Sequence, residues 1–183
     1  MKRLFFCSLL IALLAATAFA ADSTWTFNSD LEGWNSPTTW NTTIAHDAVE
    51  GHDAAGSIYC TDSDIWYGVR NTVTIGASDP AYEIRAWAKL ISTAPGEDGG
   101  LNLDTWNLDK DNMAGTSVPF DAGTTDTWQE QVQAGTADST GMGYIMINAG
   151  PWDGSDPATV EFYLDDITYT EGSGITDWAL FRK

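Results

Sequence analysis

Two adjacent aspartates, Asp165 and Asp166, lie in the middle of the strand-like stretch FYLDDITY at residues 162–169. If side chains alternate strictly along this strand, Asp165 shares a face with Ile167 and Tyr169. A carboxylate among apolar neighbours is unfavourable unless it is paired, hydrogen-bonded or bound to a metal. The sequence therefore predicts that Asp165 is a buried acid with one of these partners, and that Asp166 faces solvent or bonds to a loop amide.

A second set of side chains combines aromatic, basic, amide and acidic groups on one side of four predicted strands. In the stretch 81–90, AYEIRAWAKL, the even positions are apolar and the odd positions from 83 to 89 are Glu, Arg, Trp and Lys. Similar alternation near residues 65–71, 100–108 and 143–148 extends this non-core face. Its predicted members are Trp66, Arg70, Arg85, Trp87, Lys89, Asn102, Asp104, Trp106, Tyr144 and Asn148.

These side chains together suit the recognition of a sugar. Aromatic rings stack on the C–H faces of pyranoses, while the polar groups donate and accept hydrogen bonds to hydroxyls. If the four strands belong to one sheet, they predict a groove that binds a poly- or oligosaccharide. Two alternatives stay open: the tryptophans belong to a core or a covered sheet face, and Arg85 forms a cross-strand ion pair with Asp104.

Catalysis is not expected on this face. Glycoside hydrolysis needs two carboxyl groups across a cleft, for which Glu83 and Asp104 are the candidates. Two nearby arginines would keep both acids ionised, which is the wrong state for a general acid. His46 and His52 lie in an acidic loop region without a Ser or Cys nucleophile motif. The sequence therefore favours binding without chemistry.

The elements that position these residues are short strands. Eight runs alternate with period two, turn-rich segments separate them, and no run of useful length has a helical period. The runs are TWTF, GSIYC, IWYGVRNTVTI, AYEIRAWAKL, GLNLDTWNL, TWQEQVQ, GYIMIN and VEFYLDDITY. This pattern predicts an all-β fold, a jelly-roll β-sandwich of two antiparallel sheets.

The first twenty residues are typical of a signal peptide, with a basic start, an apolar run and a small-residue cleavage site ending at Ala20. We therefore expect a secreted protein with one sandwich domain at 21–171 and a C-terminal tail at 172–183. No later segment is long and apolar enough to span a membrane. Cleavage leaves one cysteine, Cys60, so we expect no intrachain disulfide and a buried thiol.

The chain is strongly acidic. Its 8 basic and 26 acidic residues give a net charge of −18, and loss of Lys2 and Arg3 with the signal peptide would make this −20. Nucleic acids and anionic membrane surfaces are therefore poor partners. The tail, with Trp178 and Phe181 after a Gly-Ser-Gly hinge, either folds back on the sandwich or docks to a protein partner.

Five stretches, in order, resemble the carbohydrate-binding modules of families 4, 9, 16 and 22. They are FNSDLEGWN, AAGSIYC, WYGVRNTVTI with DPAYEIRAWAKL, TDTWQEQV and FYLDDITY. The resemblance implies a β-sandwich with Trp25, Trp34 and Trp128 in its core. It also implies a structural calcium bound by Asp165, with Asn28 and Asp53 as candidate partners. Asn28 departs from the glutamate usual in the family, and Asp30 could substitute for it.

The expected function is that of a secreted, non-catalytic carbohydrate-binding protein. An adhesive or structural protein of the cell surface that engages protein partners is the main alternative. A small glycosidase is a third possibility. For Asp165, hydrogen bonds from loop N–H groups are the alternative to calcium.

Overall fold

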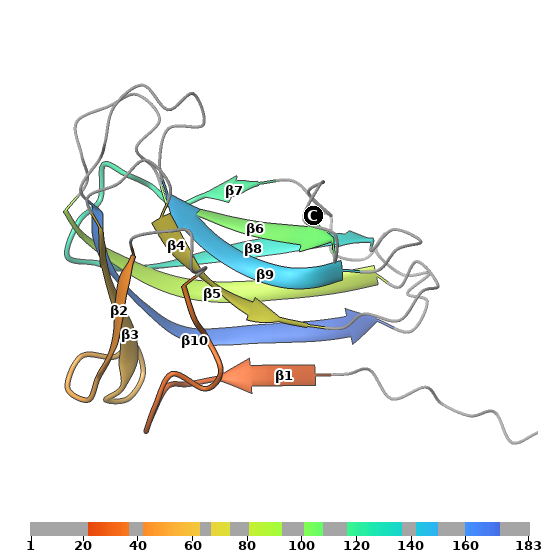
Figure 1. The fold of residues 1–183 in the computed structure, drawn as a ribbon. Coiled ribbons are helices and arrows are strands. Elements are labelled where there is room, and N and C mark those ends of the chain that lie inside the picture. Colours follow the sequence, from red (N-terminus) through yellow and green to blue (C-terminus); the bar gives the residue numbers. More distant parts are fainter. Residues whose placement is uncertain are drawn as a thin grey trace, which may run out of the picture.

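The computed structural model describes residues 22–36, 42–62, 67–73, 81–92, 101–107, 117–136, 142–149 and 160–172. These ranges contain ten strands and no helix (Figure 1). The strands are β1 (Asp22–Trp25), β2 (Thr43–Asp47), β3 (Ser57–Asp62), β4 (Tyr67–Thr72), β5 (Ala81–Ser92), β6 (Leu101–Asn107), β7 (Val118–Pro119), β8 (Trp128–Thr136), β9 (Met142–Ala149) and β10 (Val160–Gly172). The predicted signal peptide, Trp66 and residues 173–183 of the predicted tail lie outside the described ranges. Among the described residues, no helix is long and apolar enough to cross a membrane.

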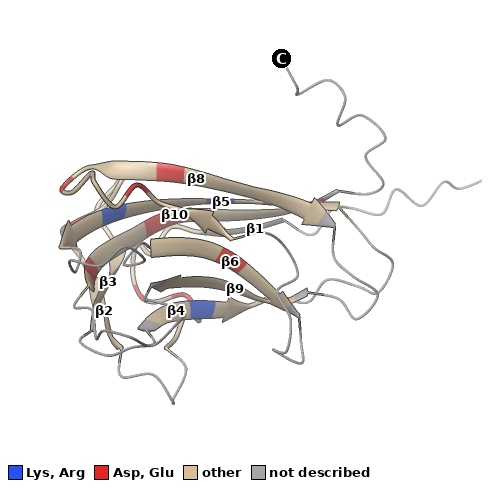
Figure 2. Cartoon of the chain, turned by 90° about the horizontal axis from the view of Figure 1, so that it is seen from above, with Lys and Arg blue, Asp and Glu red and all other residues tan. Residues whose placement is uncertain are grey.

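The strands form two antiparallel sheets that lie as separate layers (Figure 2). The six-stranded sheet has the order β2-β3-β10-β5-β8, with β1 also paired to β10. The four-stranded sheet has the order β4-β9-β6-β7. The predicted all-β sandwich of two antiparallel sheets is therefore confirmed.

The core lies between the two sheets and takes one face of each. On β5, Tyr82, Ile84, Ala86, Ala88 and Leu90 are all buried, as the alternation of this run predicts. The facing sheet contributes Val69, Leu101, Leu103, Ile145 and Ile147. Cys60 is buried in the same core with a free thiol, as predicted, and burial raises its pKa well above the usual value.

β10 does not alternate strictly. Its pairing with β5 shifts between Asp165 and Thr168, where β10 contains one residue more than its partner. Asp166 takes a positive φ of 44° at this bulge. Asp and Asn tolerate this left-handed conformation better than most non-glycine residues, and bulges commonly contain such a residue.

The bulge changes which residues face the core. Phe162 and Leu164 point inward before it, and Ile167 and Tyr169 point inward after it. Asp165 pairs with Trp87 and lies on the outer face of the six-stranded sheet. The prediction that Asp165 shares a face with Ile167 and Tyr169 is therefore wrong, because it assumed constant alternation through the pair of aspartates.

The N-terminal segment joins the two sheets. β1 pairs with β10 in the six-stranded sheet, and Asn35 then pairs with Arg70 on β4 of the other sheet. Two backbone hydrogen bonds make this bridge, with N···O distances of 3.0 and 2.9 Å. Between these points Trp34 packs into the core against Trp25, with ring centroids 5.7 Å apart. The segment thus fixes the edge strand β4 in place.

Two strands were not predicted. β2 has no buried residue and β7 has only two residues, so neither gives an apolar alternation that sequence patterns can detect. β7 nevertheless matters for the site described below, because it lies beside β6.

Candidate functional site

The outer face of the four-stranded sheet gathers aromatic and polar side chains from three adjacent strands. We call it the four-strand face, after the four-stranded sheet to which these strands belong. It is defined by Arg70, Asn102, Asp104, Trp106, Tyr144, Met146 and Asn148. The strand register arranges them in three rows: Asn148 with Asn102, Arg70 with Met146 and Asp104, and Tyr144 with Trp106. Six of these residues are ones that the sequence predicts for a ligand site.

Arg70 lies at one edge of this face on β4. Its guanidinium carbon lies 4.9 Å from the ring centroid of Tyr144 on β9, a cation–π contact. Its backbone is held by the bridge to Asn35. The pairing and the ring contact together fix the side of the sheet on which the guanidinium lies.

Asp104 lies beneath the surface at the centre of this face. Its side chain is fully buried, and burial raises the pKa of its carboxyl. Ser117 and Asn148 lie close enough to lower that pKa in part. Among the described residues, however, neither carboxylate oxygen of Asp104 accepts a hydrogen bond of good geometry. The same holds for the amide oxygen of Asn148. The face therefore contains buried acceptor oxygens that a hydroxyl donor would satisfy.

Two of the predicted ligand residues belong to the other sheet. Arg85 and Trp87 lie on β5, on the outer face of the six-stranded sheet, with Lys89 beside them. The prediction that these residues share one face with Trp106 is wrong, because β5 and β6 belong to different sheets. Trp66, the remaining predicted ligand residue, lies outside the described ranges.

The arginine on β5 has partners of its own. The guanidinium of Arg85 donates to Glu83 at 2.8 Å and to Glu130 at 3.2 Å. These carboxylates raise its pKa. The alternative that Arg85 pairs with Asp104 is therefore also wrong. Glu83 lies with Arg85 on the six-stranded sheet, so Glu83 and Asp104 lie on opposite sides of the sandwich and do not form a catalytic pair.

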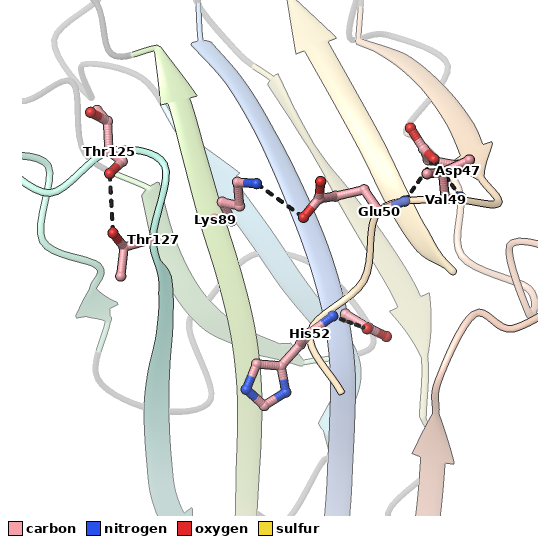
Figure 3. Close-up of polar contacts among 8 residues, drawn as sticks. Asp47, Val49, Glu50, His52, Lys89, Thr125 and Thr127 are labelled. Atoms are coloured by element: carbon pink, nitrogen blue, oxygen red, sulfur yellow. Dashed lines mark hydrogen bonds and ion pairs between the residues drawn. The ribbon is translucent and has the colours of Figure 1, made fainter. Parts of the chain in front are cut away.

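The loop between β2 and β3 covers part of the outer face of the six-stranded sheet. Figure 3 shows Glu50 and His52 on this loop, with the Lys89 side chain extending from β5 toward Glu50. The Lys89 ammonium and the Glu50 carboxylate are 3.0 Å apart. The His52 imidazole stacks on Trp87, with centroids 3.8 Å apart and planes inclined by 17°. One side of the Trp87 ring is therefore covered by the chain itself, and the side chain as a whole is partly buried.

Trp128 also belongs to this outer face. It pairs with Lys89 across β8 and β5, and the edge of its ring meets His52 at a centroid distance of 5.8 Å. The core position that the family resemblance implies for Trp128 is wrong. The same implication is confirmed for Trp34, which is buried, and Trp25 is partly buried against the core.

Asp165 is buried, as predicted, beneath the loop. One carboxylate oxygen accepts a hydrogen bond from the backbone N–H of His52 and the other from that of Asp166, both at 2.7 Å. Burial raises the pKa of this carboxyl to about 6, although the two N–H groups lower it. The structure thus shows hydrogen bonds to Asp165 from one loop N–H and from the N–H of Asp166.

The predicted calcium ligands have different surroundings. Asn28 is exposed and its amide donates to the Thr26 hydroxyl at 2.8 Å. The Asp53 side chain is 82% exposed and its carboxylate lies 3.4 Å from Nδ1 of His52. Asp165 fits a calcium site in its chemistry, since each oxygen has a further lone pair beyond its N–H bond. Asn28 and Asp53 contribute no contact to it in this structure.

Three relevant residues escaped the sequence analysis. Met146 alternates with the buried Ile145 and Ile147 and lies on the four-strand face, but it is not among the predicted members of the non-core face. Ser117 precedes a strand too short to predict. His52 was assigned to an acidic loop, and nothing in the sequence indicates that this loop folds onto β5.

No protein-family model and no curated protein matches this chain. Several solved structures share its fold at low sequence identity. The CBM22-1 xylan-binding domain of Xyn10C from Paenibacillus barcinonensis is 12% identical, with a TM-score of 0.59 over 84% of this chain and 96% of that one. A family 16 carbohydrate-binding module is 14% identical, with a TM-score of 0.54 over 79% of this chain and 94% of that one.

A third similar structure contains a sugar. It comprises the CBM22-1 and GH10 modules of endo-1,4-beta-D-xylanase 10B from Clostridium thermocellum, complexed with xylohexaose. It is 16% identical, with a TM-score of 0.59 over 84% of this chain and 29% of that longer one. These similarities confirm, at the level of fold, the resemblance to β-sandwich carbohydrate-binding modules.

Proposed function

We propose that this protein binds a poly- or oligosaccharide on its four-strand face and catalyses no reaction on it. One observation carries the proposal: the fold brings Arg70, Asn102, Asp104, Trp106, Tyr144 and Asn148 onto one face of one sheet. A sequence pattern that predicts a sugar site and a fold shared with carbohydrate-binding modules both support the proposal.

The chemistry of this face supports a sugar as the ligand. Trp106 and Tyr144 are partly exposed neighbours across β6 and β9, and can offer ring faces to a pyranose. Arg70 supplies donors, and Asn102 both donors and acceptors. Asp104 is fully buried, so we do not assign it a contact with a sugar at the surface.

The arrangement of acids supports binding without catalysis. Asp104 is the one carboxylate among the residues that define the four-strand face, and the second acid considered, Glu83, lies on the other sheet. Hydrolysis of a glycosidic bond requires two carboxyl groups that flank it. Two of the similar structures are described as carbohydrate-binding modules rather than as enzymes.

We further propose that the protein is secreted. The basic, apolar and small-residue segments that end at Ala20 support export. The net charge of −18 argues against nucleic acid as a partner.

The decisive experiment compares Trp→Ala variants on the two outer faces. Trp106→Ala should weaken retention on soluble polysaccharides by about 1–3 kcal/mol, the usual cost of truncating a principal contact residue. Binding is measured by affinity electrophoresis across a panel of polysaccharides, and stability by urea unfolding of the same samples.

Trp87→Ala is the matched control, because it removes the same side chain from the outer face of the six-stranded sheet, where His52 stacks on it. It should bind sugars as the wild type does. If Trp87→Ala loses binding while Trp106→Ala keeps it, the proposed face is wrong. If the wild type binds no polysaccharide of the panel, the proposed function is wrong.

Calcium at Asp165 remains a separate proposal. A buried carboxylate with a raised pKa would gain from a cation, and an ion that binds only the folded state stabilises it by mass action. Chelation should then lower the thermal midpoint, calcium should restore it, and Asp165→Ala should abolish the response. An unchanged midpoint in chelator would leave the two N–H groups as the complete explanation of Asp165.

A further inference from the structure

The loop between β2 and β3 holds one imidazole in a fixed position on the six-stranded sheet. The His52 ring lies flat on Trp87 at 3.8 Å, and its backbone N–H donates to buried Asp165 at 2.7 Å. The neighbouring pair of Glu50 and Lys89 attaches the same loop to β5. The position of this imidazole is therefore set by contacts with two strands, β5 and β10.

Two carboxylates converge on the same nitrogen of this imidazole. Nδ1 of His52 lies 2.9 Å from a carboxylate oxygen of Asp166 and 3.4 Å from one of Asp53. The three ligand atoms all lie within 4.8 Å of one another. Asp166 comes from the β10 bulge and Asp53 from the loop, so the group joins two segments far apart in the sequence.

The 3.4 Å between Nδ1 and the Asp53 carboxylate matches the spacing around a tetrahedral zinc ion, and the 2.9 Å contact between Nδ1 and Asp166 is a hydrogen bond that a bound ion would replace. With metal–ligand bonds of about 2.0–2.2 Å, the ligand atoms of such a site are roughly 3.3–3.5 Å apart. One imidazole nitrogen with two carboxylate oxygens is a ligand set that suits zinc and similar transition metals, whereas calcium prefers oxygen ligands alone. An ion pair between His52 and Asp166 would not require Asp53 to approach the same nitrogen.

The surroundings leave room for further ligands. The side chains of His52, Asp166 and Asp53 are 18%, 24% and 82% exposed, so the group is open to solvent on one side. With a neutral imidazole, its two carboxylates carry a formal charge of −2 in a chain of net charge −18. A divalent cation would neutralise this local charge, and water would complete its coordination.

We propose that His52, Asp53 and Asp166 bind a divalent transition-metal ion, with zinc preferred, which fastens the β2–β3 loop to the β10 bulge. The site differs from the calcium site proposed at Asp165 in its ligand atoms, because it uses an imidazole nitrogen and the Asp166 carboxylate. It lies on the sheet opposite the four-strand face, so it stands independently of carbohydrate binding.

The test measures zinc binding to the full chain after chelator treatment and removal of the chelator. Isothermal titration should show one zinc ion per protein, and zinc should raise the thermal midpoint. Asp53→Asn and Asp166→Asn should each weaken zinc binding roughly tenfold or more. Asn also tolerates the left-handed backbone at position 166, so Asp166→Asn keeps the bulge.

Two controls and one spectroscopic readout make the result specific. His46→Gln removes the other histidine, and Glu171→Gln removes one negative charge from the same strand as Asp166; both should bind zinc as the wild type does. Cu²⁺ titrated in place of zinc should quench tryptophan fluorescence, because Trp87 lies directly under the imidazole. The quenching should be lost in His52→Gln.

Zinc affinity that is the same in the wild type, Asp53→Asn and Asp166→Asn would overturn the proposal, as would the absence of saturable zinc binding. Calcium that matches zinc in affinity and in its dependence on these residues would also overturn the assignment of a transition metal. Glycan binding that persists in all these variants is expected and separates this proposal from the proposed function.

Discussion

Asp165 should make the stability of the protein depend on pH in an unusual direction. Burial raises the pKa of its carboxyl from 3.8 to about 6, against the opposing effect of two N–H hydrogen bonds. The difference between 3.8 and about 6, multiplied by 1.36 kcal/mol per pKa unit, corresponds to about 3 kcal/mol of folding free energy. This is a large fraction of the stability of a typical domain.

The sign follows from proton binding. Between about pH 4 and about pH 6 the folded chain retains a proton at Asp165 that the unfolded chain has lost. The free energy of unfolding therefore falls as the pH rises through this window. The contribution is fully present below the unfolded pKa of 3.8 and is lost above about 6. Most paired carboxylates, whose folded pKa is lowered, have the opposite effect.

The assay is urea unfolding of the wild type and Asp165→Asn in chelator at a series of pH values from about 4 to about 7. Asparagine leaves one of the two N–H groups, of His52 or of Asp166, without an acceptor, which costs about 1–3 kcal/mol at every pH. The difference in unfolding free energy between the two proteins should change by about 3 kcal/mol across the series, in favour of the variant at high pH. A difference that stays constant would refute the account of a buried carboxyl with a raised pKa. With calcium present, a bound ion would favour the charged form and reduce this change.

Three further predictions concern stability and access. Trp87→Ala should lower the free energy of unfolding by about 1–3 kcal/mol, measured in urea, because it removes the ring beneath His52. Gly56→Ala should lower it by about 1–3 kcal/mol or more, since Gly56 has a φ of 129° and an added Cβ would lie 2.4 Å from the carbonyl oxygen of Phe27. Cys60 is buried, so in the native protein it should react with a thiol reagent only as fast as the core opens. Thiol labelling much faster than the hydrogen exchange of the β3 amides would instead show that Cys60 is accessible.

The fold class could be predicted because strand alternation records burial directly. On β5, the five apolar positions from Tyr82 to Leu90 are all buried, so the phase of this strand was correct. The phases of Leu101 and Leu103, and of Ile145 and Ile147, were also correct. In each case one face of a regular strand packs against the core, which is the condition under which alternation is informative.

Sheet membership could not be predicted in the same way. Trp87 and Trp106 both lie on the non-core side of a correctly phased strand, yet they belong to different sheets. Strands of the two sheets alternate identically, because each buries one face in the same core. What assigns each strand to its sheet is its pairing partners. β5 pairs with β8 and β10, and β6 pairs with β9, and these pairings depend on long-range contacts.

The error at β10 had a signal in the sequence. Its apolar residues occupy even positions up to Leu164 and odd positions from Ile167 onward, with the two aspartates at the change. Such a change of parity indicates an inserted residue, because a strand with constant period two cannot bury both sets on one face. The bulge at Asp166 resolves this conflict and keeps both sets in the core, namely Val160, Phe162, Leu164, Ile167 and Tyr169.

The bulge also explains why two carboxylates stand side by side in an otherwise apolar strand. The backbone there leaves its regular pairing, and Asp165 accepts the N–H groups of both the bulge and the loop above it. Asp166 can then direct its carboxylate to the imidazole of His52 on the same loop. The two aspartates thus hold the loop whose His52 stacks on Trp87, which gives this tryptophan a structural contact within the chain.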